Sequence, residues 1–377
     1  FDTLASRILG GDPVDMFPYE WDAVPNGVTK EQYQPLDDYL DLGDDIWSDM
    51  SDVIEMFKYK DKHYVVPYCL SDPLLITYNR SLCEENGLDD PYELYKKDKW
   101  DWDTFMDMMK TFVSNAKDGE TRYGINGWFG QAMVQSTGET FVKYDGTKFS
   151  NNISSPAIEE AEGVMEEIMS LGLYDPTWYG YLPDDGSTLF FGMADWALGA
   201  SNVKADPKPD YEDNGYVEEN DLMIVPFPKQ PGSDEYYLNC NFGAKMLVKN
   251  SDKGAAVAAY IKCERLASMI DEYKDAAKEK AIIPEVNAQG KLKSYVTEEQ
   301  YDALQDYKDP KNITPVFDFG YGMGSRMYGD GEYTYETRGV MNNLTSALLN
   351  GDKDSWAVLR DEWSSVIDEV IDGYNNK

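Results

Sequence analysis

This chain has almost no histidine, and its few cysteines are not spaced as metal ligands or redox pairs. This scarcity excludes most metal and nucleophilic chemistry. His63 is the single histidine, so neither a histidine-based metal centre nor a Ser–His or Cys–His relay is predicted. The four cysteines show no zinc spacing and no C-x-x-C pair; they are Cys69, Cys83, Cys240 and Cys263. We expect His63 to lie in a surface turn, and Cys83 and Cys263 to be small buried hydrophobes. Nothing in the cysteine spacing demands a disulfide.

Long apolar runs, nucleotide motifs and basic residues are also scarce. No stretch approaches the ~18 apolar residues of a membrane span, no signal peptide is present, and no G-x-S-x-G, Walker A or dinucleotide fingerprint occurs. The chain has 34 basic and 70 acidic residues, for a net charge of −36, which argues against nucleic acid and anionic lipid as partners. The charge keeps a surface-exposed protein soluble; the alternative is that it also favours a cationic or metal-bearing ligand. No cofactor is predicted.

The chain does contain enough apolar sequence for two domains, with strands and helices in regular alternation. Its 377 residues are 42% hydrophobic, which supports globular folding. Apolar residues at helical spacing predict amphipathic helices, and short apolar runs predict strands between them. We therefore expect an α/β fold, with helices over 1–9, 101–115, 156–172, 253–269, 340–349 and 355–374, and strands over 14–17, 123–125, 222–227 and 243–248.

Two segments have the composition of loops. Residues 204–220 are acidic, and the end of this segment loosely follows a calcium-loop pattern. The weak candidate metal ligands there are Asp210, Glu212, Asn214 and Asp221. The preceding prolines preclude the usual incoming helix, so a solvated acidic loop is the preferred interpretation. Residues 320–331 are rich in glycine, and either bring backbone close to a ligand or form a mobile connector.

Aromatic residues carry the strongest functional signal. They make up 14% of the chain, with 28 Tyr, 14 Phe and 9 Trp. A sugar presents C–H patches that lie on aromatic faces, while its hydroxyls need short polar partners in a largely pre-formed cleft. Most of these aromatics must be core, so their position along the chain has to select the candidates for binding.

Three segments near the start follow the order found in one protein family. A turn before a short apolar strand (11–17) is followed by an exposed hairpin leading into a buried strand (60–68), then by Leu-Leu-Ile-Thr-Tyr-Asn-Arg (74–80). This order resembles the extracellular solute-binding proteins of bacterial ABC importers, of the maltose-binding type that captures sugars. The resemblance implies a two-lobe periplasmic-binding-protein-like fold with a hinge and an interlobe ligand cleft. The implied lobes are 1–72 plus 238–312, and 73–237 plus 313–377.

The same resemblance implies a function without catalysis. The protein would capture a mono- or oligosaccharide between its lobes and deliver it to an ABC permease in the membrane, as a monomer. It would be extracellular, lipid-anchored at the cell surface or periplasmic, with a first strand–helix unit preceding Phe1. One alternative is a binding protein for a cationic or metal-bearing solute, with Glu20, Asp22 and Asp72 as counter-charges. A less favoured alternative is a surface glycoside hydrolase, which needs only two carboxylates.

In the family that this order resembles, the first lobe binds the ligand through the loop after the first strand. Tyr19 and Asp22 occupy the places of an aromatic and an acidic residue that hold the sugar, with Glu20 and Trp21 between them. This loop also suits the general rule that ligands gather beyond the carboxyl ends of strands. The candidates at the outgoing and return crossings are Tyr68, Ser71, Asp72, Asn239 and Asn241.

The second lobe supplies the remaining predicted contacts. Trp128 follows a short strand and is a stacking candidate. Trp196 falls on a position that is buried in the family, so we expect it in the core. The family's stacking tryptophan would fall near Ser201, a departure for which Trp178 or Tyr179 would compensate. The last predicted contacts are Phe319, Tyr321 and Arg326.

Overall fold

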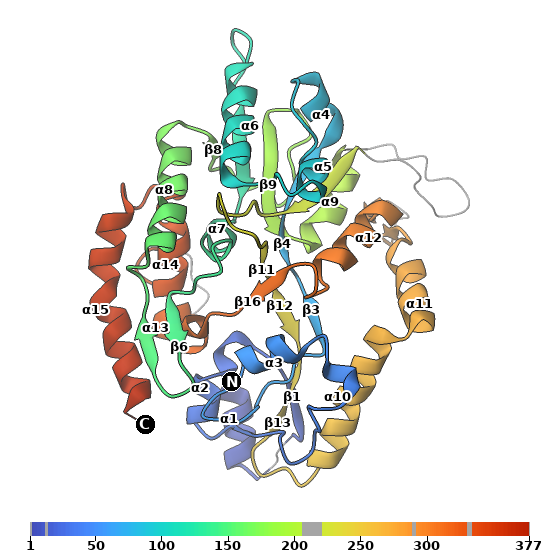
Figure 1. Ribbon diagram of the computed structural model, residues 1–377, viewed down its shortest axis with the longest axis vertical. Coiled ribbons are helices and arrows are strands. Elements are labelled where there is room, and N and C mark those ends of the chain that lie inside the picture. The colour runs from blue at the N-terminus through green and yellow to red at the C-terminus, as the bar shows by residue number, and fades with distance from the viewer. Residues whose placement is uncertain (1, 12–13, 206–220, 289–291, 330–333, 377) are drawn as a thin grey trace.

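Two separate sheets organise the chain, one in the lower half and one in the upper half of the molecule as drawn in Figure 1. The computed structural model describes residues 2–11, 14–205, 221–288, 292–329 and 334–376. A three-stranded sheet has the order β1-β13-β2, and a five-stranded sheet has the order β10-β4-β9-β5-β8. We call the part around the three-stranded sheet the lower lobe, and the part around the five-stranded sheet the upper lobe.

The strands of both sheets are short. In the lower lobe they are β1 (Met16–Pro18), β2 (Tyr33–Gln34) and β13 (Lys245–Val248). In the upper lobe they are β4 (Leu74–Asn79), β5 (Tyr123–Gly127), β8 (Tyr174–Asp175), β9 (Thr188–Ala194) and β10 (Leu222–Pro226). Every residue of β10 is buried, as a continuous apolar run predicts for a strand covered on both faces. β4 runs antiparallel to β10 and β9, whereas β5 runs parallel to β9 and β8.

Two pairs of short strands lie between the sheets. β3 (Cys69–Ser71) pairs antiparallel with β12 (Asn241–Gly243), and β11 (Tyr237–Asn239) pairs parallel with β16 (Thr314–Val316). β3 leads directly into β4 of the upper sheet, and β12 leads directly into β13 of the lower sheet. We call these two strand pairs the crossings. The predicted lobe limits fall in or beside them, and the exact division of the chain stays a prediction.

Helices cover both sheets (Figure 1). They are α1 (Asp2–Leu9), α2 (Asn26–Thr29), α3 (Ser51–Met56), α4 (Arg80–Glu85), α5 (Pro91–Lys96), α6 (Trp102–Ser114), α7 (Gly130–Gln135), α8 (Pro156–Ser170), α9 (Trp196–Ala205), α10 (Gly254–Met269), α11 (Asp271–Ala281), α12 (Glu298–Tyr307), α13 (Ser325–Tyr328), α14 (Val340–Ser346) and α15 (Trp356–Asn375). The shorter elements are η1 (Trp21–Ala23), η2 (Asp45–Trp47), η3 (Phe319–Gly322), and the pairs β6 (Val142–Tyr144) with β7 (Phe149–Asn151) and β14 (Glu285–Val286) with β15 (Leu292–Ser294). Among the described residues, no helix is both long and apolar enough to span a bilayer.

α6 shows how the local sequence sets a helix and its buried face. The Asp101 carboxylate accepts a hydrogen bond from the Thr104 N–H at 2.9 Å and caps the helix. Phe105, Met109 and Phe112 are fully buried, so the apolar face predicted from the sequence is confirmed. The alternation of such helices with the strands above confirms the α/β class.

Aromatic side chains continue the core across the crossings. Phe57 of the lower lobe stacks on Phe317, which follows β16, with ring centroids 4.1 Å apart. Phe57 also meets Phe242 of β12 edge-on at 4.8 Å. One apolar cluster therefore runs through both lobes, and the crossings are packed rather than open.

The environment of His63 differs from the predicted surface turn, so that prediction is wrong. His63 is only 8% exposed. Its Nδ1 lies 2.9 Å from an Asp37 oxygen and its Nε2 lies 3.1 Å from a Glu55 oxygen. The imidazole is buried because Asp37 and, from the preceding helix α3, Glu55 each bring a carboxylate to one of its nitrogens.

Two further local predictions are wrong. Cys263 is exposed, because it lies on the solvent side of α10, although Cys83 is buried as predicted. All four cysteines are free. The described part of the glycine-rich segment is not an extended loop, because residues 319–328 form η3 and α13 around the buried side chains of Tyr321 and Met327.

Candidate ligand-binding site

The loop after β1 lies at the boundary between the lobes. Pro18 at the end of β1 pairs with Lys245 at the start of β13, and β13 follows directly on the crossing strand β12. The carboxyl end of β1 therefore points toward the crossings. The Tyr19 N–H donates to the Ala244 carbonyl at 3.0 Å and fixes the start of the loop there.

Tyr19 and Asp22 each hold a buried oxygen that lacks a partner among the described residues. The Tyr19 ring packs edge-on against Phe57 at 5.4 Å, and its hydroxyl accepts and donates no hydrogen bond there. Burial raises the pKa of Tyr19 well above its ordinary value. The Asp22 Oδ2 accepts from the Asn26 amide at 2.7 Å, whereas Oδ1 is buried and unpartnered. Burial also raises the pKa of Asp22. Such oxygens are costly unless something satisfies them.

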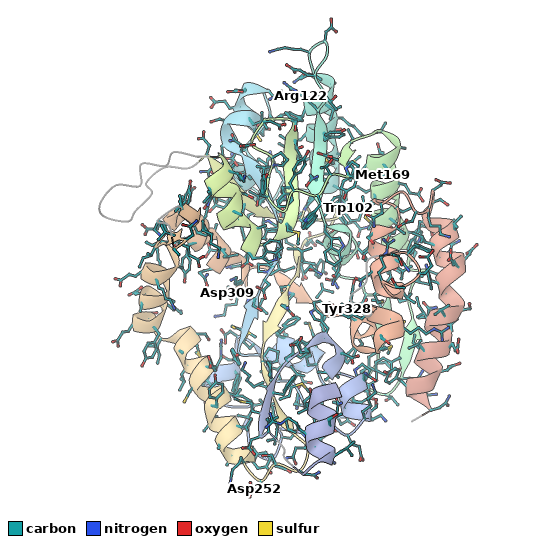
Figure 2. All side chains as sticks on the ribbon, turned by 180° about the vertical axis from the view of Figure 1, so that it is seen from behind. Trp102, Arg122, Met169, Asp252, Asp309 and Tyr328 are labelled. Atoms are coloured by element: carbon teal, nitrogen blue, oxygen red, sulfur yellow. The ribbon has the colours of Figure 1, made fainter. Side chains whose placement is uncertain are left out.

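Trp21 and Glu20 face different surroundings. Glu20 is exposed. Trp21 packs edge-on against Tyr321 at 5.0 Å and lies parallel to Tyr328 at 6.5 Å. Figure 2 places Tyr328 at the boundary of the two lobes. Trp21 therefore joins the lower lobe to the segment of η3 and α13.

The C-terminal candidates mainly stabilise the segment of η3 and α13. They are Phe319, Tyr321 and Arg326. Phe319 and Tyr321 are 6% and 2% exposed, and Phe319 packs against Tyr144 at 5.3 Å. Arg326 is about half exposed and forms a 2.9 Å ion pair with Glu369. It lines a surface hollow of about 500 Å³ beside α13 and α14.

In the upper lobe, three strands end toward the crossings. β4 begins at Leu74, directly after crossing strand β3, and Leu74 pairs with Ala194 at the end of β9. Because β5 and β8 run parallel to β9, their carboxyl ends lie at the same edge. We call this edge, with the residues that follow β5, β8 and β9, the upper edge. Ligands in α/β proteins gather at such strand ends.

Each of the three strands is followed by an exposed tryptophan. Trp128 directly follows β5, Trp178 comes three residues after β8, and Trp196 comes two residues after β9. They are 43%, 61% and 57% exposed, and Tyr179 is 37% exposed. The prediction that Trp196 belongs to the core is therefore wrong. It stands at the junction of β9 and α9, where its side chain faces solvent instead of the sheet.

Charged groups accompany Trp196 at the upper edge. The Asp195 carboxylate lies 3.3 Å from the Lys308 ammonium. Burial raises the pKa of Asp195, Lys308 lowers it, and the nearby charge of Asp72 raises it. Asp72 itself is exposed. The edge thus presents one carboxylate already balanced by a lysine and a second that is open to solvent.

The remaining crossing candidates take different places. Ser71 and Asn241 pair with each other across the first crossing and are half-buried. Tyr68 is half-buried, its N–H donates to the Gly243 carbonyl at 2.9 Å, and burial raises its pKa to about 12. Asn239 is buried, and its amide donates to the side chain of Gln135.

Ser201 is also buried rather than exposed in the cleft. Its hydroxyl accepts from the Leu182 N–H at 3.0 Å and donates to the Ala197 carbonyl at 2.9 Å. Both of its hydrogen-bonding roles are therefore used inside the protein. Sequence reasoning missed Trp196, Asp195 and Lys308. For the first two, their position just beyond a strand end was the available signal.

The weak metal candidates do not come together in the described structure. Asp210, Glu212 and Asn214 lie outside the described residues, and Asp221 accepts a hydrogen bond from the Ser81 hydroxyl at 2.8 Å. Within the described ranges, no group of three or more His, Cys, Asp or Glu side chains is placed to hold a metal ion.

The two sheets and the crossings between them give the chain a two-lobe fold. The family model of bacterial extracellular solute-binding proteins matches residues 4–231, more than half of the chain. This chain therefore belongs to that family. No curated protein sequence matches it.

Solved structures share the fold at low sequence identity. The cyclic α-maltosyl-1,6-maltose binding protein from Arthrobacter globiformis has a TM-score of 0.65 and 16% identity, over 98% of this chain and 88% of that one. The sugar-binding protein MalE from Xanthomonas citri has a TM-score of 0.65 and 14% identity, over 99% and 87%. The galacto-N-biose-/lacto-N-biose I-binding protein of the ABC transporter from Bifidobacterium longum, in complex with lacto-N-biose, has a TM-score of 0.63 and 13% identity, over 99% and 86%.

Proposed function

We propose that this protein is the substrate-binding component of an ABC importer and that it captures a carbohydrate between its lobes. The observation that carries the proposal is the upper edge, where three exposed tryptophans follow the strand ends and the carboxylates of Asp72 and Asp195 lie near one of them. Aromatic faces and polar partners together are what a sugar needs. The sugars named for the similar binding proteins of Arthrobacter globiformis and Bifidobacterium longum support the same solute class.

In the proposed mechanism, each lobe supplies half of the site. The loop after β1 offers the Tyr19 hydroxyl and the Asp22 carboxylate, and the upper edge offers aromatic plates. A ligand that touches both lobes shifts the population toward the closed form by its differential affinity. A wrong sugar would leave buried oxygens of the loop unpaired, which provides specificity. No step of this cycle requires catalysis.

The proposal includes a membrane partner and a place outside the membrane. The permease would recognise the closed form and receive the sugar from it. We propose that the protein works as a monomer, at the cell surface through a lipid anchor or in the periplasm. Membership of an extracellular family supports this location.

A cationic solute is the main competing ligand, because Glu20 and Asp72 are exposed carboxylates. Two observations favour sugar. Asp195 is already paired with Lys308 at 3.3 Å, and the exposed aromatics are the plates that a sugar requires. A cleft that binds a cationic solute would instead be expected to have carboxylates facing one another and no exposed aromatic side chains.

A thermal-shift panel tests the solute class. The purified protein would be melted with neutral mono- and oligosaccharides, polyamines and divalent metals, each at a fixed concentration. A ligand at ~100-fold its dissociation constant adds about 2.7 kcal/mol of stability and raises the melting temperature visibly. We expect a rise with one sugar class and no product after long incubation. A rise only with polyamines or metals would contradict the proposal, and released product would indicate a hydrolase.

A further inference from the structure

The C-terminal end of α15 reaches the loop after β1 through hydrogen bonds that meet at Asn26. The Tyr374 hydroxyl donates to the Asn26 Oδ1 at 3.0 Å. The Asn26 amide in turn donates to the Asp22 Oδ2 at 2.7 Å. Asn26 and Tyr374 are both buried, so little water competes for these hydrogen bonds. Three side chains therefore form a continuous path from α15 to the Asp22 carboxylate.

α15 is held in place by elements outside the lower lobe. It packs against α8, α14 and β7 (Figure 1). Near its end, the Asn375 Oδ1 accepts from the Phe149 N–H at 2.8 Å, and the Asn375 amide donates to the Phe149 carbonyl at 3.0 Å. The ring of Tyr374 meets that of Phe149 edge-on at 6.3 Å. The position of the Tyr374 hydroxyl therefore follows β7 and α15, and not the loop that it contacts.

The chemistry of these groups decides which way the Asn26 amide points. An ionised carboxylate only accepts hydrogen bonds, whereas an amide has a donating nitrogen and an accepting oxygen. The Asn26 nitrogen must therefore face Asp22, which leaves its oxygen for the Tyr374 hydroxyl. Gly324, between η3 and α13, lies against the same amide, because a Cβ added to it would be 3.8 Å from the Asn26 nitrogen. With Oδ2 of Asp22 held in this way, Oδ1 is the buried oxygen that lacks a partner among the described residues.

The Asn26 hydrogen bond also affects the charge of Asp22. Burial raises the pKa of Asp22, and the hydrogen bond from Asn26 is the strongest effect that opposes burial. The other charged or titratable side chains of this neighbourhood, among the described residues, are Lys30, Glu20, Tyr33 and Tyr374. A change in the position of the Asn26 amide is therefore expected to change the proton affinity of Asp22.

We infer that Asn26 is a positioning residue for the Asp22 carboxylate and that Tyr374 ties this position to α15. The inference rests on the proposed capture of a carbohydrate and adds a control of the same site. If the lobes separate, the Tyr374 hydroxyl leaves Asn26, and the amide is free to turn away from Asp22. The carboxylate then presents its open oxygen correctly only when α15 is seated on the loop. Ligand affinity and the seating of α15 are therefore coupled, each favouring the other.

The pKa of Asp22 in the ligand-free protein tests this link without any sugar. Carbon-13 NMR of labelled aspartate carboxyls gives the titration midpoint, and the resonance that is missing from Asp22→Asn identifies the residue. Tyr374→Phe removes a hydroxyl that does not contact Asp22, yet we expect it to raise the midpoint by about one pH unit, because Asn26 is no longer held toward the carboxylate. Tyr335→Phe is the matched control, since it removes a hydroxyl that accepts from Trp363 of α15 at 3.1 Å, and it should leave the midpoint unchanged.

Calorimetry with maltotriose, cellotriose, lacto-N-biose and spermidine then tests the effect on binding. For a sugar that binds the parent, we expect Tyr374→Phe to weaken affinity by about three- to tenfold and Tyr335→Phe to have no effect. Asn26→Leu should weaken affinity at least as much as Tyr374→Phe. Adding Tyr374→Phe to Asn26→Leu should cause no further loss, because Tyr374 acts through Asn26. Should Asn26→Leu fail to fold, the comparison of Tyr374→Phe with Tyr335→Phe still decides.

The outcomes separate this inference from the proposed function. An Asp22 midpoint that Tyr374→Phe leaves unchanged, or that Tyr335→Phe moves equally, would overturn the link whatever the protein binds. A midpoint that moves only in Tyr374→Phe, together with binding of spermidine and of no sugar, would support the link and overturn carbohydrate capture. Equal affinities of the parent and Tyr374→Phe for a sugar that Asp22→Asn no longer binds would overturn the positioning role and leave sugar capture standing.

Discussion

Replacing Gly127 by alanine tests whether the strand end that carries Trp128 is held as tightly as the structure indicates. Gly127 has a φ of +108°, a conformation that residues with a side chain rarely adopt. A Cβ atom added there would lie 2.2 Å from the Gly192 carbonyl oxygen of neighbouring β9. The contact is with backbone, so no flexible side chain can move aside.

The expected loss in the free energy of unfolding of Gly127→Ala is the sum of two separate contributions. The positive φ should cost about 1–2 kcal/mol in an alanine, and overpacking against the neighbouring strand should add about 1–3 kcal/mol. Gly146 provides the matched control, because its φ is +91° but no atom lies within 4 Å of its added Cβ. We expect Gly127→Ala to lower the free energy of unfolding by about 2–5 kcal/mol and Gly146→Ala by about 1–2 kcal/mol.

Urea denaturation of the parent and both variants measures this difference. Equal denaturant slopes would show that the midpoints report stability alone. We also expect Gly127→Ala to weaken sugar binding, since Trp128 directly follows the displaced strand end. Two variants of equal stability would refute the close approach of β5 to β9 at Gly192.

The other predictions concern single side chains. Asp22→Ala should weaken sugar binding by about tenfold, because a buried hydrogen bond to the ligand is lost; unchanged affinity in calorimetry would remove Asp22 from the site. Burial raises the pKa of Asp318 to about 7 from an ordinary value of 3.8, so the folded chain binds this proton more tightly than the unfolded chain. Stability should therefore fall as the pH rises from about 4 to 7, and Asp318→Asn should flatten that part of the stability curve; the same slope in both proteins would refute this. Burial alone would raise the pKa of Asp37, but hydrogen bonds from His63 hold it below 3.8. The ionised Asp37 therefore stabilises the folded chain above pH 3.8, and this contribution is lost as the pH falls through the folded pKa. His63→Gln should cost about 1–3 kcal/mol at pH 7 and much less at low pH, as urea midpoints at several pH values would show.

The fold could be predicted largely because its signals are local or ordered along the chain. The Asp101 cap and the apolar spacing of α6 act within one helix, so the sequence alone contains them. The two-lobe arrangement followed from the order of three segments and a family resemblance. The loop after β1 is a candidate site from sequence alone because a strand end is visible there and ligands gather beyond such ends; its ligand role stays a prediction.

The failures share a cause in tertiary packing. His63 is buried by carboxylates from two other segments, which no pattern around residue 63 reveals. The register with a family segment predicts Trp196 in the core. Its exposure depends instead on where β9 stops, because a shift of one or two residues at a strand end moves a side chain from the sheet to solvent. The glycines of segment 320–331 predict a loop, but Gly322 is required by a close approach, since its added Cβ would lie 1.8 Å from the Val24 carbonyl.

The most direct test of the central claim is a tryptophan fluorescence titration with the neutral oligosaccharide identified by thermal shift. If a sugar binds at the upper edge, the emission should change saturably with the same dissociation constant as calorimetry. The change should vanish in the variant that carries Trp128→Phe, Trp178→Phe and Trp196→Phe together. An unchanged signal in that variant, or a saturable change with polyamines and none with any sugar, would contradict carbohydrate capture at this edge.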